Sequence, residues 1–235
     1  MTARKDTLLA HLGRDSPRWE GAVNTPVVRA STILYDNVKD YEAGHAHRFT
    51  APHYGRYGTA TTRALEETVA AIEGGYRAIA MPSGLAAINA SLLAFLRPGD
   101  HLLMVDTVYG PARRFCNEVL AKQGVATTFY DPAIGAGIEA LIEPQTRAVY
   151  CETPGSLTFE MQDVPSIAAA AHRHGAVVLS DNTWGTPYHF SSFAHGVDVS
   201  IHGSDQLSLE WCGRVGRGGR RDYWLSQASS SRYRE

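Results

Sequence analysis

The stretch AVVLSDNTW (176–184) decides the fold, together with VDVSIH (197–202) and the GSDQ that follows it (203–206). Both apolar runs have the length and the β-branched content of buried strands. The first run leaves an acid, Asp181, at its carboxyl end. Because open α/β sheets bind ligands at the carboxyl ends of their strands, we expect Asp181 to lie in a binding site. The second run is expected to bring another functional residue to the same edge.

Strands and helices alternate along the chain from about residue 62. Leu65, Val69 and Ile72 have helical spacing, and Gly74-Gly75 ends that helix. Strands are then expected within 76–84 and at 101–105, 125–130 and 147–152, and helices at 84–96, about 111–123, 137–143 and 164–175. This alternation predicts an α/β fold with a mostly parallel, doubly wound sheet covered on both faces.

The composition is that of an ordinary globular chain, with 235 residues, 44% of them hydrophobic, and a net charge of -2. No basic excess indicates nucleic acid or a membrane surface, and no apolar stretch is long enough to span a bilayer, so neither is expected as a partner. The N-terminus lacks the apolar core of a secretory signal, and the cysteines form no CxxC pair. A cytoplasmic location is therefore expected.

The chain is expected to have three parts. Residues 1–52 are predicted to form an N-terminal arm, because NTPVVRASTILY (24–35) is β-branched, interrupted by proline and without a helical period. Residues 53–206 carry the α/β alternation. Residues 207–235 are rich in Arg, Gly and Ser and have no sustained period, which indicates an irregular tail.

Two motifs could bind a phosphate. PSGLAAI (82–88) places a Ser-Gly pair where a strand passes into a helix, so backbone amides would be exposed at the helix start. In HYGRYG (53–58), Tyr54 and Arg56 would project a phenol and a guanidinium from a loop, and arginine suits bidentate phosphate binding. Each motif also has a plainer interpretation, a common turn in the first case and an exposed loop arginine in the second.

Two further residues lie at the ligand edge of the predicted sheet. Tyr109 follows the strand HLLMV (101–105) and could stack on a flat ligand, although an aromatic at such a position is more often simply packed against its neighbours. Asp181 needs a partner if it is buried, and a protonated pyridine nitrogen would serve. Alternatively, Asp181 caps the turn that follows it.

Taken together, these motifs resemble the Cys/Met-metabolism family of pyridoxal-phosphate enzymes, and its cystathionine β-lyases most of all. The resemblance covers about residues 7–202. It rests on motifs in the family's order and spacing: NTPVVRAST, YGRYGT, IEGG, PSGLAA, LRPGDHLLM, TVYGP, ETPGSLTFEMQDVPSI, DNTWGTPYHF and GVDVSIH.

The resemblance implies an incomplete fold-type I, pyridoxal-phosphate transferase-like large domain over residues 53–206. It also implies pyridoxal 5'-phosphate as cofactor, a small sulfur amino acid as substrate, and a homodimer or tetramer. Tyr54 and Arg56 would bind the cofactor phosphate of the neighbouring subunit, and Gly84 and Leu85 would offer that phosphate their backbone amides.

The same resemblance assigns the remaining site residues. Tyr109 would stack on the pyridine ring, and Asp181 would pair with the ring nitrogen. Ser204 would complete the cofactor site. Thr153 and Ser156 belong to a loop that lies near cofactor and substrate in the family.

The chain departs from the family after VDVSIH. There the family has one or two small residues, a threonine, and then the lysine that forms a Schiff base with the cofactor, whereas this chain has Gly203, Ser204, Asp205 and Gln206. Gln206 has no nucleophilic amine. Asp205 would bring a negative charge close to the phosphate.

No other lysine is expected to replace the missing one. Lys5, Lys39 and Lys122 lie in segments that match other parts of the family. The resemblance stops near residue 202, and the family's C-terminal domain, with the arginine that holds the substrate carboxylate, is not matched. We therefore hypothesise a truncation or frameshift after about codon 202, which the coding DNA would test.

The implied activity is that of a transsulfuration carbon–sulfur lyase in methionine biosynthesis, which converts cystathionine to homocysteine, pyruvate and ammonia. Because Gln206 occupies the lysine position, we expect this chain to be inactive, and whether it is an enzyme stays open. The alternatives are γ-lyase or γ-synthase chemistry, and a non-catalytic fragment or pseudoenzyme. A nucleotide-binding domain is less consistent, since no GxGxxG or GxxxxGK[ST] follows a strand.

Overall fold

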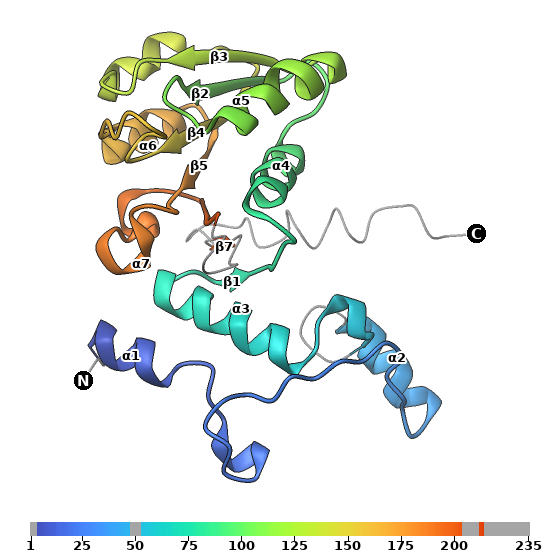
Figure 1. Ribbon diagram of the computed structural model, residues 1–235. Helices are drawn as coiled ribbons and strands as arrows, with labels where there is room; N and C mark the ends of the chain where they lie inside the picture. The colour runs from blue at the N-terminus through green and yellow to red at the C-terminus, as the bar shows by residue number, and fades with distance from the viewer. Residues whose placement is uncertain (1–3, 48–52, 204–211, 214–235) are drawn as a thin grey trace. The chain divides into compact units, whose positions relative to one another are not determined.

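A computed structural model of the chain describes residues 4–47, 53–203 and 212–213 (Figure 1). The chain divides into two compact units, Met1–Ile72 and Glu73–Glu235. The sequence-based division at residues 52 and 206 stays a prediction, since 206 lies outside the described residues and the break between the units lies at 72. In the part of the chain that the structure describes, no helix is both long enough and apolar enough to cross a bilayer.

The first unit contains short helices joined by extended chain. Its elements are α1 (Lys5–His11), η1 (Ser16–Trp19), α2 (Val38–Ala46), η2 (Gly55–Tyr57) and nearly all of α3 (Ala60–Glu73). As predicted, no helix forms over residues 24–35. This segment is tied to the start of α3 by Thr61, whose hydroxyl donates to the Pro26 carbonyl at 2.6 Å and accepts from the Val28 amide at 2.8 Å.

The second unit is built on one sheet with the strand order β1-β7-β6-β5-β4-β2-β3. The strands are β1 (Arg77–Ala78), β2 (His101–Val105), β3 (Ala126–Tyr130), β4 (Thr146–Glu152), β5 (Val177–Asp181), β6 (Val199–Ile201) and β7 (Cys212–Gly213). The five strands from β6 to β3 are parallel, whereas β7 pairs antiparallel with both β1 and β6. The predicted α/β fold with a mostly parallel sheet is confirmed.

The helices of this unit follow the strands largely as predicted. They are α4 (Gly84–Phe95), α5 (Gly110–Phe115), η3 (Cys116–Leu120), η4 (Ala121–Gln123), η5 (Gly135–Leu141), α6 (Val164–Arg173), α7 (Thr186–His189) and η6 (Ser192–His195). The single helix expected for about 111–123 is in fact α5, a π-helical turn (η3) and a 3₁₀ turn (η4) in succession. The helix expected at 137–143 is likewise a 3₁₀ helix, η5, shifted toward the N-terminus.

The order of the strands creates a topological switch point between β2 and β4. After β2 the chain moves through α5 to β3 at one edge, and after β4 it moves through α6 to β5 in the other direction. Because crossovers between parallel strands are right-handed, these opposite directions place α5 and α6 on opposite faces of the sheet. Helix α4 contacts α5 and therefore covers the same face (Figure 1). The loops after β2 and β4 diverge, which leaves a crevice at the strand ends.

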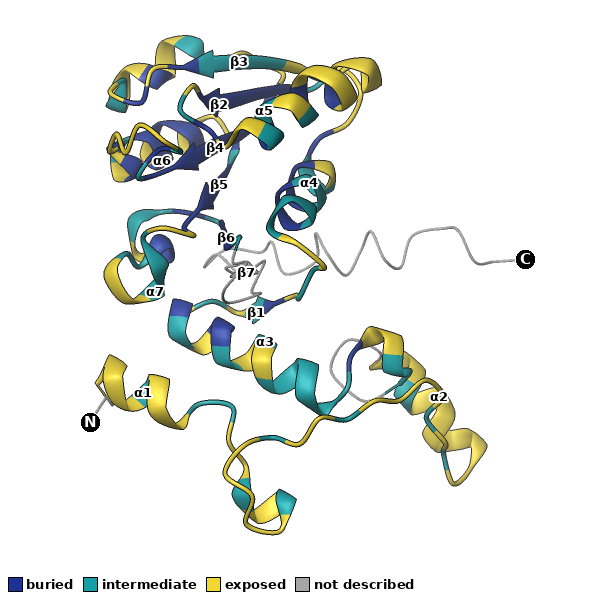
Figure 2. Cartoon of the chain, viewed as in Figure 1, coloured by how far each residue is buried: buried dark blue, intermediate teal, exposed yellow. Residues whose placement is uncertain are grey.

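The central strands form the core. Every residue of β2 is buried, as expected for a parallel strand covered on both faces (Figure 2). Leu103 of β2 and Val149 of β4 are register partners, and neither has any exposed surface. Burying one side chain of this size contributes about 1.5–3 kcal/mol to folding.

We predict that Leu103→Ala lowers the free energy of unfolding by about 2–5 kcal/mol, because it leaves a cavity in the covered sheet. Leu93→Ala on α4 is the matched control, since 47% of the Leu93 surface is exposed. The control should change the free energy of unfolding by less than about 0.5 kcal/mol. Urea unfolding of the full chain measures both, and equal losses would contradict the placement of the core.

Candidate functional site

A pocket of about 360 Å³ opens at the carboxyl ends of the parallel strands. Its walls come from the residues after β2, β4, β5 and β6 and from the start of α4, all within the second unit. Such a volume falls in the range of small-molecule sites. The pocket lies at the switch point of the sheet, which is where doubly wound proteins bind their ligands.

One wall of the pocket is the N-terminus of α4. Ser83 caps this helix, and its side-chain oxygen accepts a hydrogen bond from the Ala86 amide at 3.1 Å. The amides of the first helical turn have no partner within the helix and carry partial positive charge. Gly84 and Leu85 line the pocket here, so the predicted phosphate motif does reach the ligand edge of the sheet.

Two glycines meet at this wall. A Cβ atom built on Gly84 would lie 2.4 Å from the Cα of Gly203, a distance that no side chain tolerates. Gly203 is itself held by its amide, which donates to the Thr183 hydroxyl at 2.6 Å. The loop after β6 can therefore approach the start of α4 only because residue 84 is a glycine, whereas a Cβ atom on Gly203 would lie 3.4 Å from its nearest neighbours.

Asp181 ends β5 and lines the pocket, as predicted. The carboxyl group is buried, and its Oδ1 accepts a hydrogen bond from the Thr183 amide at 2.9 Å. Burial raises the pKa of Asp181 above its ordinary value, while the hydrogen bonds from Thr183 and the charge of His202 act in the opposite direction. A cationic partner would favour the ionised form further.

A second carboxyl group, Glu152, lies beside Asp181 in the same pocket. The two residues are register partners at the ends of β4 and β5. Burial, and then the negative charge of Asp181, raise the pKa of Glu152 from 4.5 to about 8, so Glu152 is largely protonated at neutral pH. The sequence analysis missed Glu152, although the argument applied to Asp181, an acid at the end of a buried strand, would have found it.

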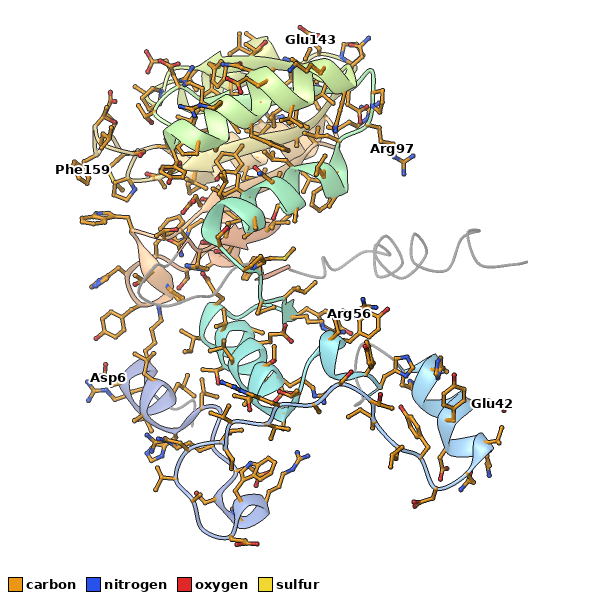
Figure 3. All side chains as sticks on the ribbon, turned by 45° about the vertical axis from the view of Figure 1, so that its right-hand side comes forward. Asp6, Glu42, Arg56, Arg97, Glu143 and Phe159 are labelled. Atoms are coloured by element: carbon orange, nitrogen blue, oxygen red, sulfur yellow. The ribbon has the colours of Figure 1, made fainter. Side chains whose placement is uncertain are left out.

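Tyr109 is positioned by Glu152. The Tyr109 amide donates to Oε2 of Glu152 at 2.8 Å, which ties the loop after β2 to the end of β4. The ring lines the pocket and is partly exposed, so it is available to a ligand. Further apolar surface comes from Phe159, which is labelled in Figure 3. Trp184 also lines the pocket, and its ring centre lies 5.4 Å from that of Phe159. Neither of these two rings was predicted to belong to the site.

The loop after β4 brings only one of its two predicted residues to the pocket. Ser156 lines it, and the Ser156 amide donates to the Thr107 carbonyl at 2.8 Å. Thr153 is buried beneath the surface, where its hydroxyl accepts from the Gln162 amide at 3.0 Å. The peptide bond between Thr153 and Pro154 is cis.

The remaining predicted site residues do not belong to the described part of the second unit. Tyr54 and Arg56 belong to the first unit, where the Arg56 guanidinium lies over the Tyr54 ring at 5.3 Å (Figure 3). Their role toward a cofactor stays a prediction. Ser204 and Gln206 lie outside the described residues.

Comparison with known protein families decides what kind of site this is. The family profile described as "Cys/Met metabolism PLP-dependent enzyme" matches residues 6–206. The chain belongs to this family. The predicted resemblance is therefore confirmed, and pyridoxal phosphate is the cofactor on which the family depends.

Two similar proteins are named as cystathionine beta-lyases. The chain is 51% identical over 199 residues to a "Putative cystathionine beta-lyase" of Rhizobium johnstonii and covers 49% of it. It is 40% identical over 199 residues to cystathionine beta-lyase MetC of Escherichia coli and covers 50% of it. These matches include 85% and 83% of this chain. The chain thus spans about half the length of the curated relatives it matches.

The fold is shared with solved structures of the family's enzymes. The crystal structure of metB from Corynebacterium glutamicum superposes with a TM-score of 0.83 at 25% sequence identity. The superposition covers 97% of this chain and 59% of metB. The expected fold class of the Cys/Met-metabolism family is thus confirmed.

The residues of the pocket fit pyridoxal phosphate. The amides at the start of α4 suit a phosphate, and the contact between Gly84 and Gly203 keeps side chains out of that wall. The Tyr109 ring offers a flat surface for a pyridine. Asp181 is a buried carboxyl group that a protonated ring nitrogen would stabilise in its ionised form.

We predict that Glu152→Gln makes the free energy of unfolding less sensitive to pH. Between pH 4.5 and 8 the native state holds a proton on Glu152 that the unfolded chain has lost, so wild-type stability falls as pH rises through this window. The variant keeps an acceptor for the Tyr109 amide and lacks that titration. From pH 5 to pH 8 it should gain roughly 2–4 kcal/mol relative to wild type.

Urea unfolding at the two pH values measures this difference. Glu118→Gln, at an exposed position of η3, is the control and should follow the wild-type profile. Parallel stability profiles for Glu152→Gln and wild type would show that Glu152 titrates normally.

Proposed function

We propose that this chain carries the pyridoxal-phosphate site of a cystathionine β-lyase-type carbon–sulfur lyase and holds the cofactor without a covalent bond. The main support is Asp181, a buried acid in a pocket at the switch point of the sheet, next to the amides of a helix N-terminus. When bound, pyridoxal phosphate supplies a protonated pyridine ring that accepts the electron pair left on the α-carbon of an amino acid.

The residues of the pocket divide the binding between them. The backbone amides of Gly84 and Leu85 hold the phosphate, because the N-terminus of α4 favours a negative charge. Asp181 accepts a hydrogen bond from the ring nitrogen, and Tyr109 covers one face of the ring. Glu152 stays protonated and fixes the Tyr109 backbone, so it adds no second negative charge beside Asp181.

In the family the cofactor-bound lysine also transfers the proton at the α-carbon, and in our proposal this chain has no lysine for that step. In our proposal Gln206 occupies the position of the family's cofactor-bound lysine, and an amide neither attacks a carbonyl nor accepts a proton from carbon. Cleavage of cystathionine to homocysteine, pyruvate and ammonia is therefore not expected of this chain. We favour β-lyase over γ-lyase or γ-synthase ancestry, because the cited relatives are named as cystathionine β-lyases.

The assembly and the cell compartment remain predictions. We propose a homodimer or tetramer in which Tyr54 and Arg56 reach the cofactor of a neighbouring subunit, and a cytoplasmic location. A non-catalytic fragment or pseudoenzyme that pairs with an intact relative is the alternative, favoured by Gln206 at the position proposed for the lysine.

We predict that the chain binds pyridoxal phosphate and that Asp181→Asn weakens this binding about tenfold or more. The variant removes a charge-assisted hydrogen bond, which contributes about 1.5–3 kcal/mol. Titration with the cofactor, followed by quenching of tryptophan fluorescence, measures the dissociation constant. Asp36→Asn, at an exposed position of the first unit, should bind as wild type does. A wild-type chain that shows no saturable binding would refute the proposed function.

We also predict that Gln206→Lys restores covalent attachment. After treatment with cofactor and borohydride, intact-mass measurement should find the added mass on Gln206→Lys and not on wild type, because only the variant has an amine at this position. Lys5, Lys39 and Lys122 are common to both proteins and so control for unspecific labelling. Equal labelling of the two proteins would place the reactive lysine elsewhere.

A further inference from the structure

A buried carboxylate outside the pocket joins the strands that carry the site. Glu73, the last residue of α3 and the first of the second unit, has a side chain with no exposed surface. Its Oε1 accepts hydrogen bonds from Asn182 Nδ2 at 3.2 Å and from Ser200 Oγ at 2.9 Å, and it contacts His202 Nε2. The roles assigned above to the pocket residues do not use this group.

The three partners of Glu73 are all close to Asp181. One follows Asp181 in the sequence, and the other two flank the residue that is paired with Asp181 in the sheet. Asn182 directly follows Asp181, and its amide donates to the Ile201 carbonyl at 2.7 Å. Ile201, the last residue of β6, is the register partner of Asp181, and Ser200 and His202 precede and follow it in the chain. A single carboxylate oxygen thus connects the end of β5 to both sides of the residue paired with Asp181.

Glu73 and His202 lie close enough to form a buried ion pair when the imidazole is protonated. A buried carboxylate is costly unless a cation or several hydrogen bonds compensate it. Of the three partners, only His202 can carry a positive charge. Since His202 Nε2 faces a carboxylate oxygen, the contact needs one proton between the two groups. Only 8% of the His202 side-chain surface is exposed, so water screens the interaction between Glu73 and His202 little.

A positive charge on His202 favours the ionised form of Asp181. His202 acts to lower the pKa of Asp181, against the effect of burial. The other titratable groups coupled to Asp181 are Glu152 on the neighbouring strand β4 and the buried hydroxyl of Tyr150, and neither is a cation. Among these groups His202 is therefore the one that favours an ionised Asp181.

We propose that Glu73 and His202 are positioning residues that keep Asp181 ionised and in place for a protonated ring nitrogen. Glu73 holds the imidazolium, and the imidazolium offsets the desolvation of Asp181. This inference rests on the proposed function for its purpose, although the coupling itself belongs to the chain without cofactor.

The decisive variant replaces both members of the pair, Glu73→Gln with His202→Gln. A single replacement would leave an uncompensated buried charge and endanger the fold, whereas the double variant removes both charges and keeps polar groups. Ser192→Ala is the matched control. It removes the hydroxyl 3.1 Å from Ser200 Oγ and so disturbs the same cluster of hydrogen bonds without changing its charge.

The first measurement uses the full chain without cofactor. Nuclear magnetic resonance of isotope-labelled aspartate carboxyl carbons follows the titration of Asp181, which Asp181→Asn assigns. In the double variant the midpoint should rise by about one pH unit, a tenfold change in proton affinity, and in Ser192→Ala it should stay at the wild-type value. An unchanged midpoint in the folded double variant, or an equal shift in Ser192→Ala, would overturn the proposal. If this double variant does not fold, Glu73→Gln with His202→Asn, which also removes both charges, is measured and judged in the same way.

The second measurement uses the chain loaded with pyridoxal phosphate that is labelled at the ring nitrogen. Its nitrogen signal should show deprotonation about one pH unit lower in the double variant than in wild type. A chain that binds no cofactor refutes the proposed function, and the Asp181 titration then decides the positioning role by itself. A chain that binds cofactor and shows neither shift keeps the proposed function and loses the positioning role.

Discussion

Three adjacent parallel strands end in register at the pocket, and this pairing determines what the site can do. Glu152, Asp181 and Ile201 are aligned partners on β4, β5 and β6. Because parallel strands point their carboxyl ends to the same edge, polar residues that are far apart in the sequence meet there. A shift of one residue in β4 or β5 would turn the carboxyl group at the end of that strand to the opposite face of the sheet.

The register also places two acidic side chains, Glu152 and Asp181, next to each other. Two carboxyl groups side by side in a buried pocket cannot both ionise at low cost. In this protein Glu152 takes the proton, with a pKa of about 8, and its oxygen is used to hold the Tyr109 amide. Asp181 receives hydrogen bonds from Thr183 and the field of His202. The pocket is thus prepared for one cationic ligand group, which is consistent with a pyridinium ring.

A close contact between the backbone at the start of α4 and the backbone of the loop after β6 shapes the rest of the pocket. Gly84 and Gly203 come from elements far apart in the sequence, and any side chain on Gly84 would collide with Gly203. Their contact sets the start of α4 beside the loop after β6, so the helix amides and Asp181 line the same cavity. In our proposal the family's cofactor-bound lysine would follow this loop, at the position of Gln206.

The sequence by itself determined the local elements and the residues at their ends. The apolar runs predicted β2, β3, β4 and β5, and the helical spacing predicted α3, α4 and α6, because periodicity and end signals act within a few residues. The same reasoning placed Asp181 at a strand end and Gly84 at a helix start. Only the tertiary structure placed Glu152 beside Asp181 and brought Glu73 to Asn182, 109 residues away in the chain. Such contacts depend on the order of the strands in the sheet and on which helix and sheet faces pack together. The sequence pattern of a single segment does not predict them.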